Sequence, residues 1–267
     1  VYSLKMDNKE VLSDGEALAV CKILLESRAF AKPEMNRIID KIIHSCLPKR
    51  SFSKVMALIA NEKFYYIEPK HKKQVIGRIR NIGHAIQEHL LLDVEYERQE
   101  KSVVKRRLKP VGILFSEYYF YLAAFIADGG KKVKKEKQDN LLPTIYRIDR
   151  IKAMDILKEH FSVPYQDRFQ EGEFRKRVQF MYDGPLQKVK LEYTGPSVEA
   201  VLDRLPTAEI VEAKKGKYIV SAEVFGLGIE LWIRSQGSMI KVLEPKELAD
   251  KIKADLKREL ARYEEQA

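Results

Sequence analysis

The sequence predicts an α+β protein with a helical N-terminal segment, a small antiparallel β-barrel and a C-terminal domain that mixes strands and helices. Two changes in the hydrophobic pattern indicate this class. Up to about Leu90 the apolar residues recur at helical spacing, and beyond it they alternate with polar residues, as in strands. After Gly184 short strands and helices follow one another. These changes divide the chain into residues 1–89, 90–162, 163–184 and 185–267.

Four helices are predicted in the N-terminal segment. Ser13 and Glu16 have the capping-box spacing that begins a helix, and Pro33 suits the first turn of a second helix. A third helix is expected over 51–61 and a fourth over 71–90. We expect this segment to act as a spacer that packs helices or pairs two copies of the chain, without a catalytic role.

The middle of the chain is predicted to be mostly β. The expected strands cover residues 90–98, 102–109, 118–126 and 144–149. Pro110 and Gly112 are expected to end the second strand, because proline cannot donate to a sheet. At least four antiparallel strands in so short a span favour a closed or nearly closed small barrel. The apolar spacing over 151–161 predicts a helix that closes this domain.

The C-terminal part is predicted to form a separate domain. Residues 163–184 are charged and aromatic and are expected to be a connector. From Val189 to Leu243 the pattern runs strand, helix, strand, strand, helix, strand, and Pro245 begins a terminal helix. This βαββαβ order is typical of a ferredoxin-like domain.

Three motifs of the middle region occur in a recognisable order. They are Arg106-Arg107-Leu108-Lys109-Pro110, the triplet Phe120-Tyr121-Leu122, and the strand Tyr146-Arg147-Ile148-Asp149-Arg150-Ile151. This arrangement resembles the WYL domain of bacterial transcriptional regulators, with Phe120 in place of the first Trp. The region around Trp232 and the step from Val242 to Pro245 resembles the C-terminal extension that commonly follows WYL domains. The resemblance covers about 90–263 and implies an Sm-like barrel.

Candidate ligand-binding residues come from the same motifs. A barrel would bring together arginines from separate strands, whose planar forks bind phosphates, beside aromatic rings able to stack a base. The resemblance implies that the triplet tyrosine and the arginines of the third motif line a basic pocket. The candidate ligand-binding residues are Arg147, Tyr121, Arg150, Arg107 and Tyr119. Arg106 is an alternative to Arg107, Tyr121 is alternatively a core aromatic, and Arg150 alternatively pairs with Asp149.

Composition and the remaining motifs limit the classes of function. The chain has 49 Lys and Arg against 39 Asp and Glu, a net charge of +10 that attracts anions. Residues 128–140 carry five lysines and are expected to be a solvated loop, or alternatively an arm that contacts phosphates. The histidines lack metal-ligand spacing, and no dinucleotide or nucleophile motif is present, so we expect no metal, no cofactor and no enzyme. Cys21 and Cys46 are expected to be reduced thiols of a cytoplasmic protein without a membrane span.

Two functions are compatible with these features. The first is the ligand-sensing part of a bacterial transcriptional regulator, which binds a nucleotide or single-stranded nucleic acid, pairs as a homodimer, and contacts operator DNA only through a domain upstream of Val1. The alternative is a stand-alone accessory module that binds single-stranded RNA or DNA. Salt dependence separates them, because a module that follows a strand should show a steep slope and a sensor of a small nucleotide a shallow one.

Overall fold

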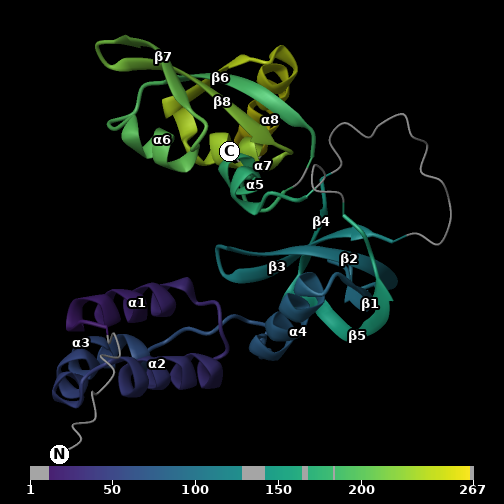
Figure 1. The fold of residues 1–267 in the computed structure, drawn as a ribbon. Helices are drawn as coiled ribbons and strands as arrows, with labels where there is room; N and C mark the ends of the chain where they lie inside the picture. Colours follow the sequence, from purple (N-terminus) through teal and green to yellow (C-terminus); the bar gives the residue numbers. More distant parts are fainter. Residues whose placement is uncertain (1–11, 128–141, 164–167, 183, 265–267) are drawn as a thin grey trace, which may run out of the picture.

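The computed structural model describes residues 12–127, 142–163, 168–182 and 184–264. Helices occupy the N-terminal part, and two antiparallel sheets follow along the chain (Figure 1). The α+β class and the N-terminal helices predicted from the sequence are confirmed. The lysine-rich loop over 128–140 lies outside the described residues.

The N-terminal segment contains the helices α1 (Asp14–Ser27), α2 (Lys32–Cys46), α3 (Phe52–Phe64) and α4 (Ile76–Gln87), with a short 3-10 turn, η1 (Lys49–Ser51), before α3. The predicted capping box is confirmed: the amide of Glu16 donates to the Ser13 hydroxyl, and the Glu16 carboxylate accepts from the amide of Ser13 at 2.8 Å. Pro33 lies in the first turn of α2, as predicted.

The predicted fourth helix over 71–90 is too long at both ends. Residues 71–75 form a loop, and α4 begins only at Ile76. The buried carboxylate of Glu34 on α2 sets this start, because it accepts hydrogen bonds from the amides of Val75 at 3.0 Å and Ile76 at 3.2 Å. These amides have no partner within α4, so a carboxylate from another helix replaces the usual local cap.

The first sheet contains the strands β1 (Leu90–Glu97), β2 (Val103–Ser116), β3 (Tyr119–Ile126), β4 (Thr144–Arg147) and β5 (Ile151–His160), in the order β4-β3-β2-β1-β5. The 3-10 turn η3 (Ile148–Arg150) joins the two edge strands β4 and β5. No strand pairing closes the sheet between these edges in the described residues, so the structure does not show the closed barrel.

The helix predicted over 151–161 is wrong, because these residues form β5 and pair with β1. Ile151, Met154 and Ile156 lie opposite Tyr96, Val94 and Leu92 respectively. The register shifts between Glu95 and Tyr96, and this irregularity changes the phase of the apolar residues. A spacing of three residues from Ile151 to Met154 therefore looks helical in the sequence.

The expectation that Pro110 and Gly112 end a strand is also wrong. Strand β2 continues through both residues to Ser116, with a register shift between them where it pairs with β3. A Cβ atom at Gly112 would lie 2.3 Å from Oε1 of Glu171, and the same oxygen accepts a hydrogen bond from the amide of Ile113 at 3.0 Å. The register shift and the missing side chain at Gly112 leave room for the Glu171 carboxylate, which comes from the predicted connector.

The two faces of the first sheet pack against different parts of the chain. Leu108, Leu122 and Ala124 belong to a core that also contains Met35 of α2 and Ile82 of α4. The helical segment and the sheet therefore share one hydrophobic core. On the opposite face of β3, Ala123 packs with residues of a short helix, α5 (Glu171–Arg177), and the segment after it.

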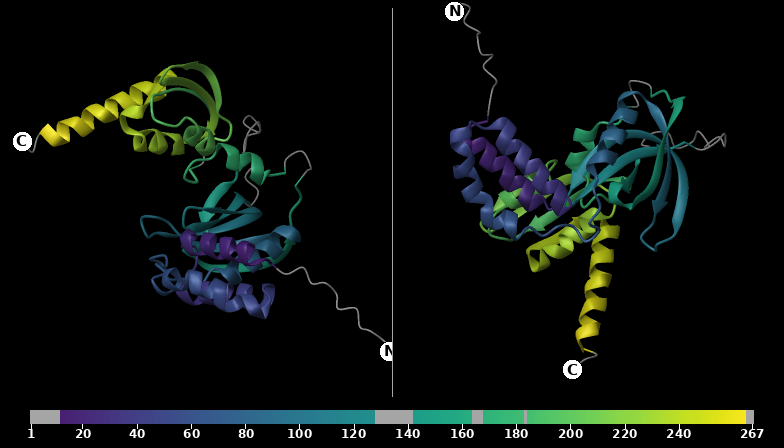
Figure 2. Two further views of the ribbon diagram at one scale, coloured as in Figure 1. Left: turned by 90° about the vertical axis from the view of Figure 1, so that its left-hand side faces the viewer. Right: turned by 90° about the horizontal axis from the view of Figure 1, so that it is seen from below.

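The second sheet contains β6 (Leu186–Tyr193), β7 (Glu209–Lys214), β8 (Lys217–Phe225) and β9 (Ile240–Glu244), in the order β7-β8-β6-β9. The helices α6 (Glu199–Arg204) and α7 (Gly228–Ser235) lie between strands along the chain, and α8 (Lys246–Glu264) follows β9. Leu191, Val220 and Trp232 lie in its core. Figure 2 shows α8 extending away from this domain.

The predicted connector contains α5 and packs against both sheets. Phe174 joins the apolar cluster on β3 and stacks on Phe225 of β8, with ring centroids 5.8 Å apart. Arg177 forms an ion pair with Glu223 of β8 at 3.3 Å, and Val178 bridges to Phe225. These residues therefore act as a packed joint between the two domains and not as a loose linker.

Candidate anion-binding site

The first sheet brings Tyr121 and Arg147 together. They are direct partners across β3 and β4, and Tyr119 lies two residues from Tyr121 on the same face of β3. The guanidinium carbon of Arg147 lies 3.4 Å from the centroid of the Tyr119 ring. This stacking stabilises a cation over the negative face of an aromatic ring.

Asp149 holds one edge of the Arg147 guanidinium. Nε donates to Oδ1 at 3.0 Å and Nη2 donates to Oδ2 at 2.9 Å. The Asp149 side chain is 6% exposed and that of Arg147 is 21% exposed. Burial lowers the pKa of Arg147, but the hydrogen bond and charge of Asp149 and the nearby tyrosines outweigh it, so the pKa is raised overall. The sequence left open a pair between Asp149 and Arg150, whereas the structure pairs Asp149 with Arg147.

The loop between α3 and α4 supplies two residues that the sequence analysis missed. Nζ of Lys73 donates to the backbone carbonyl of Asp149 at 2.6 Å, and the His71 ring centroid lies 6.1 Å from that of Tyr119. The helix predicted over 71–90 includes both residues. The available signal was Pro69 followed by a polar run to Gln74, which favours a turn. The site is therefore shared between the helical segment and the sheet.

Tyr121 is half-buried and combines both of the interpretations left open by the sequence. Its side chain borders the apolar cluster that contains Phe174, as a core aromatic would, while its strand position places it beside Arg147. Burial raises the pKa of Tyr121 to about 12, so the phenol is neutral at physiological pH. A neutral phenol offers a ring for stacking and a hydroxyl for hydrogen bonding.

Arg150 lies close to this cluster along the chain and Arg107 does not. Arg150 is half-buried in η3, next to Asp149, and its side chain makes no hydrogen bond or ion pair within the described residues. The carbonyl of Arg107 accepts from the amide of Ala127, which directly follows β3 and is six residues beyond Tyr121, roughly 20 Å along the chain direction of that strand. The structure therefore groups Arg147, Tyr119 and Tyr121, with Arg150 beside them, and leaves Arg107 apart.

Arg107 is held by carboxylates of its own. Its Nε and Nη2 donate to Asp93 at 2.9 Å and 3.1 Å, and Nη1 lies 3.5 Å from Glu159. The alternative residue, Arg106, lies opposite Val94 on the neighbouring strand and donates to the carbonyl of Lys105. Neither arginine joins the cluster around Arg147.

The charges around Arg147 favour an anion. Arg147, Lys73 and Arg150 carry positive charge. The Asp149 carboxylate is hydrogen-bonded to Arg147, and the negative charges of Glu68 and Glu117 act on His71 and Tyr121. His71 is neutral near pH 7, because burial lowers its pKa. Half-buried cations interact with a bound anion more strongly than exposed ones, since they are less screened by water and salt.

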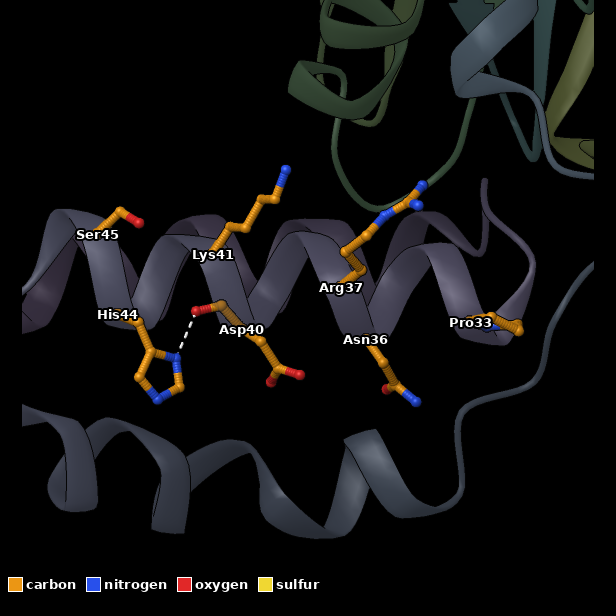
Figure 3. A pocket seen from close by; sticks show the side chains of 7 residues that line it. All are labelled: Pro33, Asn36, Arg37, Asp40, Lys41, His44 and Ser45. Atoms are coloured by element: carbon orange, nitrogen blue, oxygen red, sulfur yellow. Dashed lines mark hydrogen bonds between the residues drawn. The ribbon is translucent and has the colours of Figure 1, made fainter.

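Two surface hollows lie elsewhere. The larger, of about 540 Å³, is lined by seven residues that all belong to α2, as Figure 3 shows. Arg37 and Lys41 point to one side of this helix, while Asp40 and His44 point toward the neighbouring helix, and Asp40 is paired with Lys63 at 2.5 Å. A smaller hollow of about 390 Å³ lies between the end of α4 and β5 and includes His84 and His160. Neither hollow is lined by Arg147 or Tyr121.

Other chemistries find little support in the described part of the chain. It contains no group of His, Cys, Asp and Glu side chains arranged to hold a metal ion. Cys21 is buried and Cys46 is partly exposed, and both are free thiols. Among the described helices, none has the length and apolar character needed to cross a bilayer.

Comparison with known proteins assigns both domains. The family model of the WYL domain matches residues 77–156, and that of the WCX domain matches residues 185–260. No curated protein matches the chain.

Two solved structures are similar to the chain at low identity. Proteasome accessory factor B/C (PafBC) of Arthrobacter aurescens is 15% identical with a TM-score of 0.38, over 94% of this chain and 36% of that one. A CRISPR Cas-related protein is 14% identical with a TM-score of 0.47, over 98% of this chain and 76% of that one. The chain thus spans about a third of the length of PafBC. On the two family matches, the chain carries a WYL domain followed by a WCX domain.

Proposed function

We propose that this chain is the ligand-sensing regulatory part of a bacterial transcriptional regulator and that it binds a nucleotide or single-stranded nucleic acid at Arg147. The observation that carries the proposal is the half-buried Arg147 guanidinium, stacked on Tyr119 beside Tyr121. A guanidinium suits phosphate oxygens and an aromatic ring suits a base. The WYL and WCX matches support a regulatory role.

The finer fold assignments belong to the same proposal. The order β4-β3-β2-β1-β5, with a 3-10 turn between the edge strands, supports an Sm-like barrel that is open between β4 and β5. The order β7-β8-β6-β9, with helices after β6 and β8, supports a ferredoxin-like C-terminal domain. In this arrangement the ligand lies at the open edge of the barrel.

The shared walls of the site suggest how a ligand is sensed. His71 and Lys73 belong to the helical segment, while Arg147 and Tyr119 belong to the sheet. A ligand that contacts both parts favours the arrangement in which they lie together, and so shifts the population toward it. We propose that a DNA-binding domain upstream of Val1 responds to this shift and that the chain pairs as a homodimer.

We propose no catalytic role. Within the described residues, no serine hydroxyl or cysteine thiol is hydrogen-bonded to a histidine, and the Asp149 carboxylate is engaged by Arg147. The groups around Arg147 are suited to binding and stacking and lack an activated nucleophile.

The second candidate function is a stand-alone module that binds single-stranded nucleic acid. The net charge of +10 favours it, because phosphate contacts contribute most of the affinity for a strand. A steep fall of affinity with salt would support this candidate, and a shallow fall would support the sensor.

The test of the proposed function is the loss of binding on changing Arg147. We expect Arg147→Ala to abolish binding of a fluorescein-labelled oligothymidylate or of a labelled nucleotide, as measured by fluorescence anisotropy. Arg147→Lys should bind poorly, since an ammonium does not replace the planar fork. Arg147→Ala leaves the buried Asp149 carboxylate without its partner, so its melting temperature should fall, and binding is compared at a temperature where every variant is folded.

The matched control is Arg107→Ala, which removes an arginine held by a carboxylate in the same way on the same sheet. This variant should bind like the parent. If both Arg147 variants also bind like the parent, the ligand site lies elsewhere.

A further inference from the structure

Two arginines of the first sheet are held by aspartates in the same geometry. Asp149 accepts from Nε and Nη2 of Arg147, and Asp93 accepts from Nε and Nη2 of Arg107. The surroundings of the pairs differ. The Asp149 side chain is 6% exposed and its arginine is stacked on Tyr119, whereas the Asp93 side chain is 43% exposed. Burial and stacking therefore fix only the first pair.

Asp149 is itself held in place. It follows the fully buried Ile148 in the 3-10 turn η3, and its backbone carbonyl accepts from Nζ of Lys73 at 2.6 Å. The amide of Arg147 donates to the Tyr96 hydroxyl at 3.3 Å. The carboxylate therefore has a fixed position relative to the strand that carries Arg147.

The contacts of Arg147 leave one edge of its guanidinium available. The group is planar, with an Nε/Nη2 edge and an Nη1/Nη2 edge. Asp149 takes the first edge and the Tyr119 ring covers one face. In the described part of the chain, Nη1 of Arg147 donates to no acceptor. The free donors thus lie on the edge away from Asp149.

We propose that Asp149 is a positioning residue, which holds Arg147 so that its Nη1/Nη2 edge binds a phosphate group of the ligand. The inference rests on the proposed function and adds that Asp149 fixes the orientation of Arg147 in that site. A guanidinium fixed by a carboxylate and an aromatic ring loses little conformational entropy when it binds, and this preorganisation raises affinity. Asp149 acts through Arg147 and makes no contact with the ligand.

The opposite role is that of an internal competitor, in which the carboxylate occupies the place of the phosphate. The two roles predict opposite effects of Asp149→Asn, because removing a competitor tightens binding and removing a positioning group weakens it. The buried position of Asp149 and its use of the Nε edge favour positioning. The edge that Asp149 leaves unoccupied is the one with donors available to a ligand.

The experiment measures anisotropy of a fluorescein-labelled oligothymidylate at near-physiological salt. We expect Asp149→Asn to weaken binding about tenfold, the size of effect expected when one charge-assisted hydrogen bond is lost. Asp93→Asn, the matched control, should bind like the parent. In an Arg147→Lys background, Asp149→Asn should cause no further loss, because a lysine has no fork to be positioned.

Each outcome supports or overturns the inference. Equal or tighter binding by Asp149→Asn overturns it, and so does an equal loss in the Arg147→Lys background. If Asp149→Asn fails to fold, Asp149→Glu replaces it, and its longer side chain should displace the fork and still weaken binding. Loss of binding in Arg147→Ala with normal binding in Asp149→Asn leaves the proposed function standing and removes only this inference.

Discussion

Arg147 shows how a half-buried cation is tolerated in this fold. Burying a charge is unfavourable unless it is paired and hydrogen-bonded, and Arg147 meets both conditions through Asp149 and gains a stacking contact with Tyr119. Removing Asp149 would leave a buried charge unpaired, which is more destabilising than removing an exposed ion pair. The site is therefore expected to be sensitive to the protonation of its neighbours.

The nearest neighbour that titrates close to physiological pH is His71. Burial lowers its pKa, as do Arg147 and Lys73, and these effects outweigh the opposing charges of Asp149 and Glu68. A histidine whose pKa is lower in the folded state contributes stability above its unfolded value of about 6.5 and loses it as the pH falls through the folded value. We expect the melting temperature to fall as the pH drops below about 6.5, more steeply for the parent than for His71→Gln.

The control for this prediction is His160→Gln, which changes an exposed histidine at the end of β5. It separates the effect of removing a histidine beside Tyr119 from that of removing one at the surface. Identical pH profiles of the melting temperature for the parent and His71→Gln would mean that the ionisation of His71 is not coupled to folding.

At the scale of residues, the sequence predicts which residues form the site better than it predicts which residues they contact. The motifs placed Tyr121 and Arg147 together, and the register of β3 with β4 makes them direct neighbours. The partner of Asp149 was not predictable, because a 3-10 turn between β4 and β5 directs its carboxylate back to Arg147. His71 was missed because its place depends on Glu34, a residue of another helix, which ends the loop by capping α4.

At the scale of elements, the joint between β2 and α5 depends on Gly112. Glu171 of α5 reaches the amide of Ile113 only because no side chain stands at the bulge. We expect Gly112→Ala to displace Glu171 and to destabilise the protein by roughly 1.5–3 kcal/mol, the range for a lost hydrogen bond to a charged group. Urea denaturation measures the change.

Two further variants isolate this contact. In a Glu171→Ala background, Gly112→Ala should lower the free energy of unfolding only slightly, because Oε1 of Glu171, the atom that the new Cβ would clash with, is absent. Gly77→Ala on α4, where a Cβ meets nothing within 4 Å, should stabilise the protein by about 0.5–1 kcal/mol through helix propensity. If Gly112→Ala lowers the free energy of unfolding by the same amount with and without Glu171, the bulge needs glycine for another reason.

The elements that sequence analysis misassigned share a cause. In β5 a register shift places Ile151 and Met154 on one side at a spacing of three residues, which imitates a helix. In β2 the strand passes through Pro110 by means of a shift in pairing. Both irregularities depend on the partner strand, so the local pattern alone did not reveal them. Helices with local signals, such as the capping box of Ser13 and Glu16, were predicted correctly.

At the scale of the whole molecule, the helical segment is a part of the first domain. Its helices share a core with the first sheet, and α5 packs that sheet against the second. The division at residue 89 follows a change in sequence pattern, but the hydrophobic contacts cross it. Sequence analysis identified both families of domain, whereas contacts between distant segments, such as that of Phe174 with Phe225, leave no local pattern.

The exposed apolar side chains of α8 bear on the oligomeric state. Leu256, Leu260 and Tyr263 are 56%, 59% and 80% exposed and recur at helical spacing on α8, which extends away from its domain (Figure 2). We expect the chain to be a dimer, with a mass near twice 31.0 kDa by light scattering at micromolar concentration. Leu256→Glu should weaken the dimer if α8 takes part in it. A mass near 31.0 kDa for the parent would contradict the prediction.

The last prediction concerns DNA. We expect this chain to show no preference for a duplex that contains the regulator's own promoter over a scrambled duplex, because α1, α2, α3 and α4 each bury one face in the core of the first domain. A single strand should bind more tightly than either duplex, since its unstacked bases can reach Tyr119 while Arg147 contacts phosphates. Anisotropy with the three probes at one near-physiological salt concentration makes the comparison.

The outcomes of that comparison point to different parts of the molecule. Much tighter binding to the promoter duplex would mean that a helix of the N-terminal segment reads DNA. Arg37 and Lys41 on α2 would then be the first residues to mutate (Figure 3). Single-strand binding no tighter than scrambled duplex would count against the Arg147 site as a nucleic-acid site. In that case a small anionic nucleotide, which needs one phosphate contact and one stacked ring, becomes the ligand that the geometry of Arg147 and Tyr119 favours.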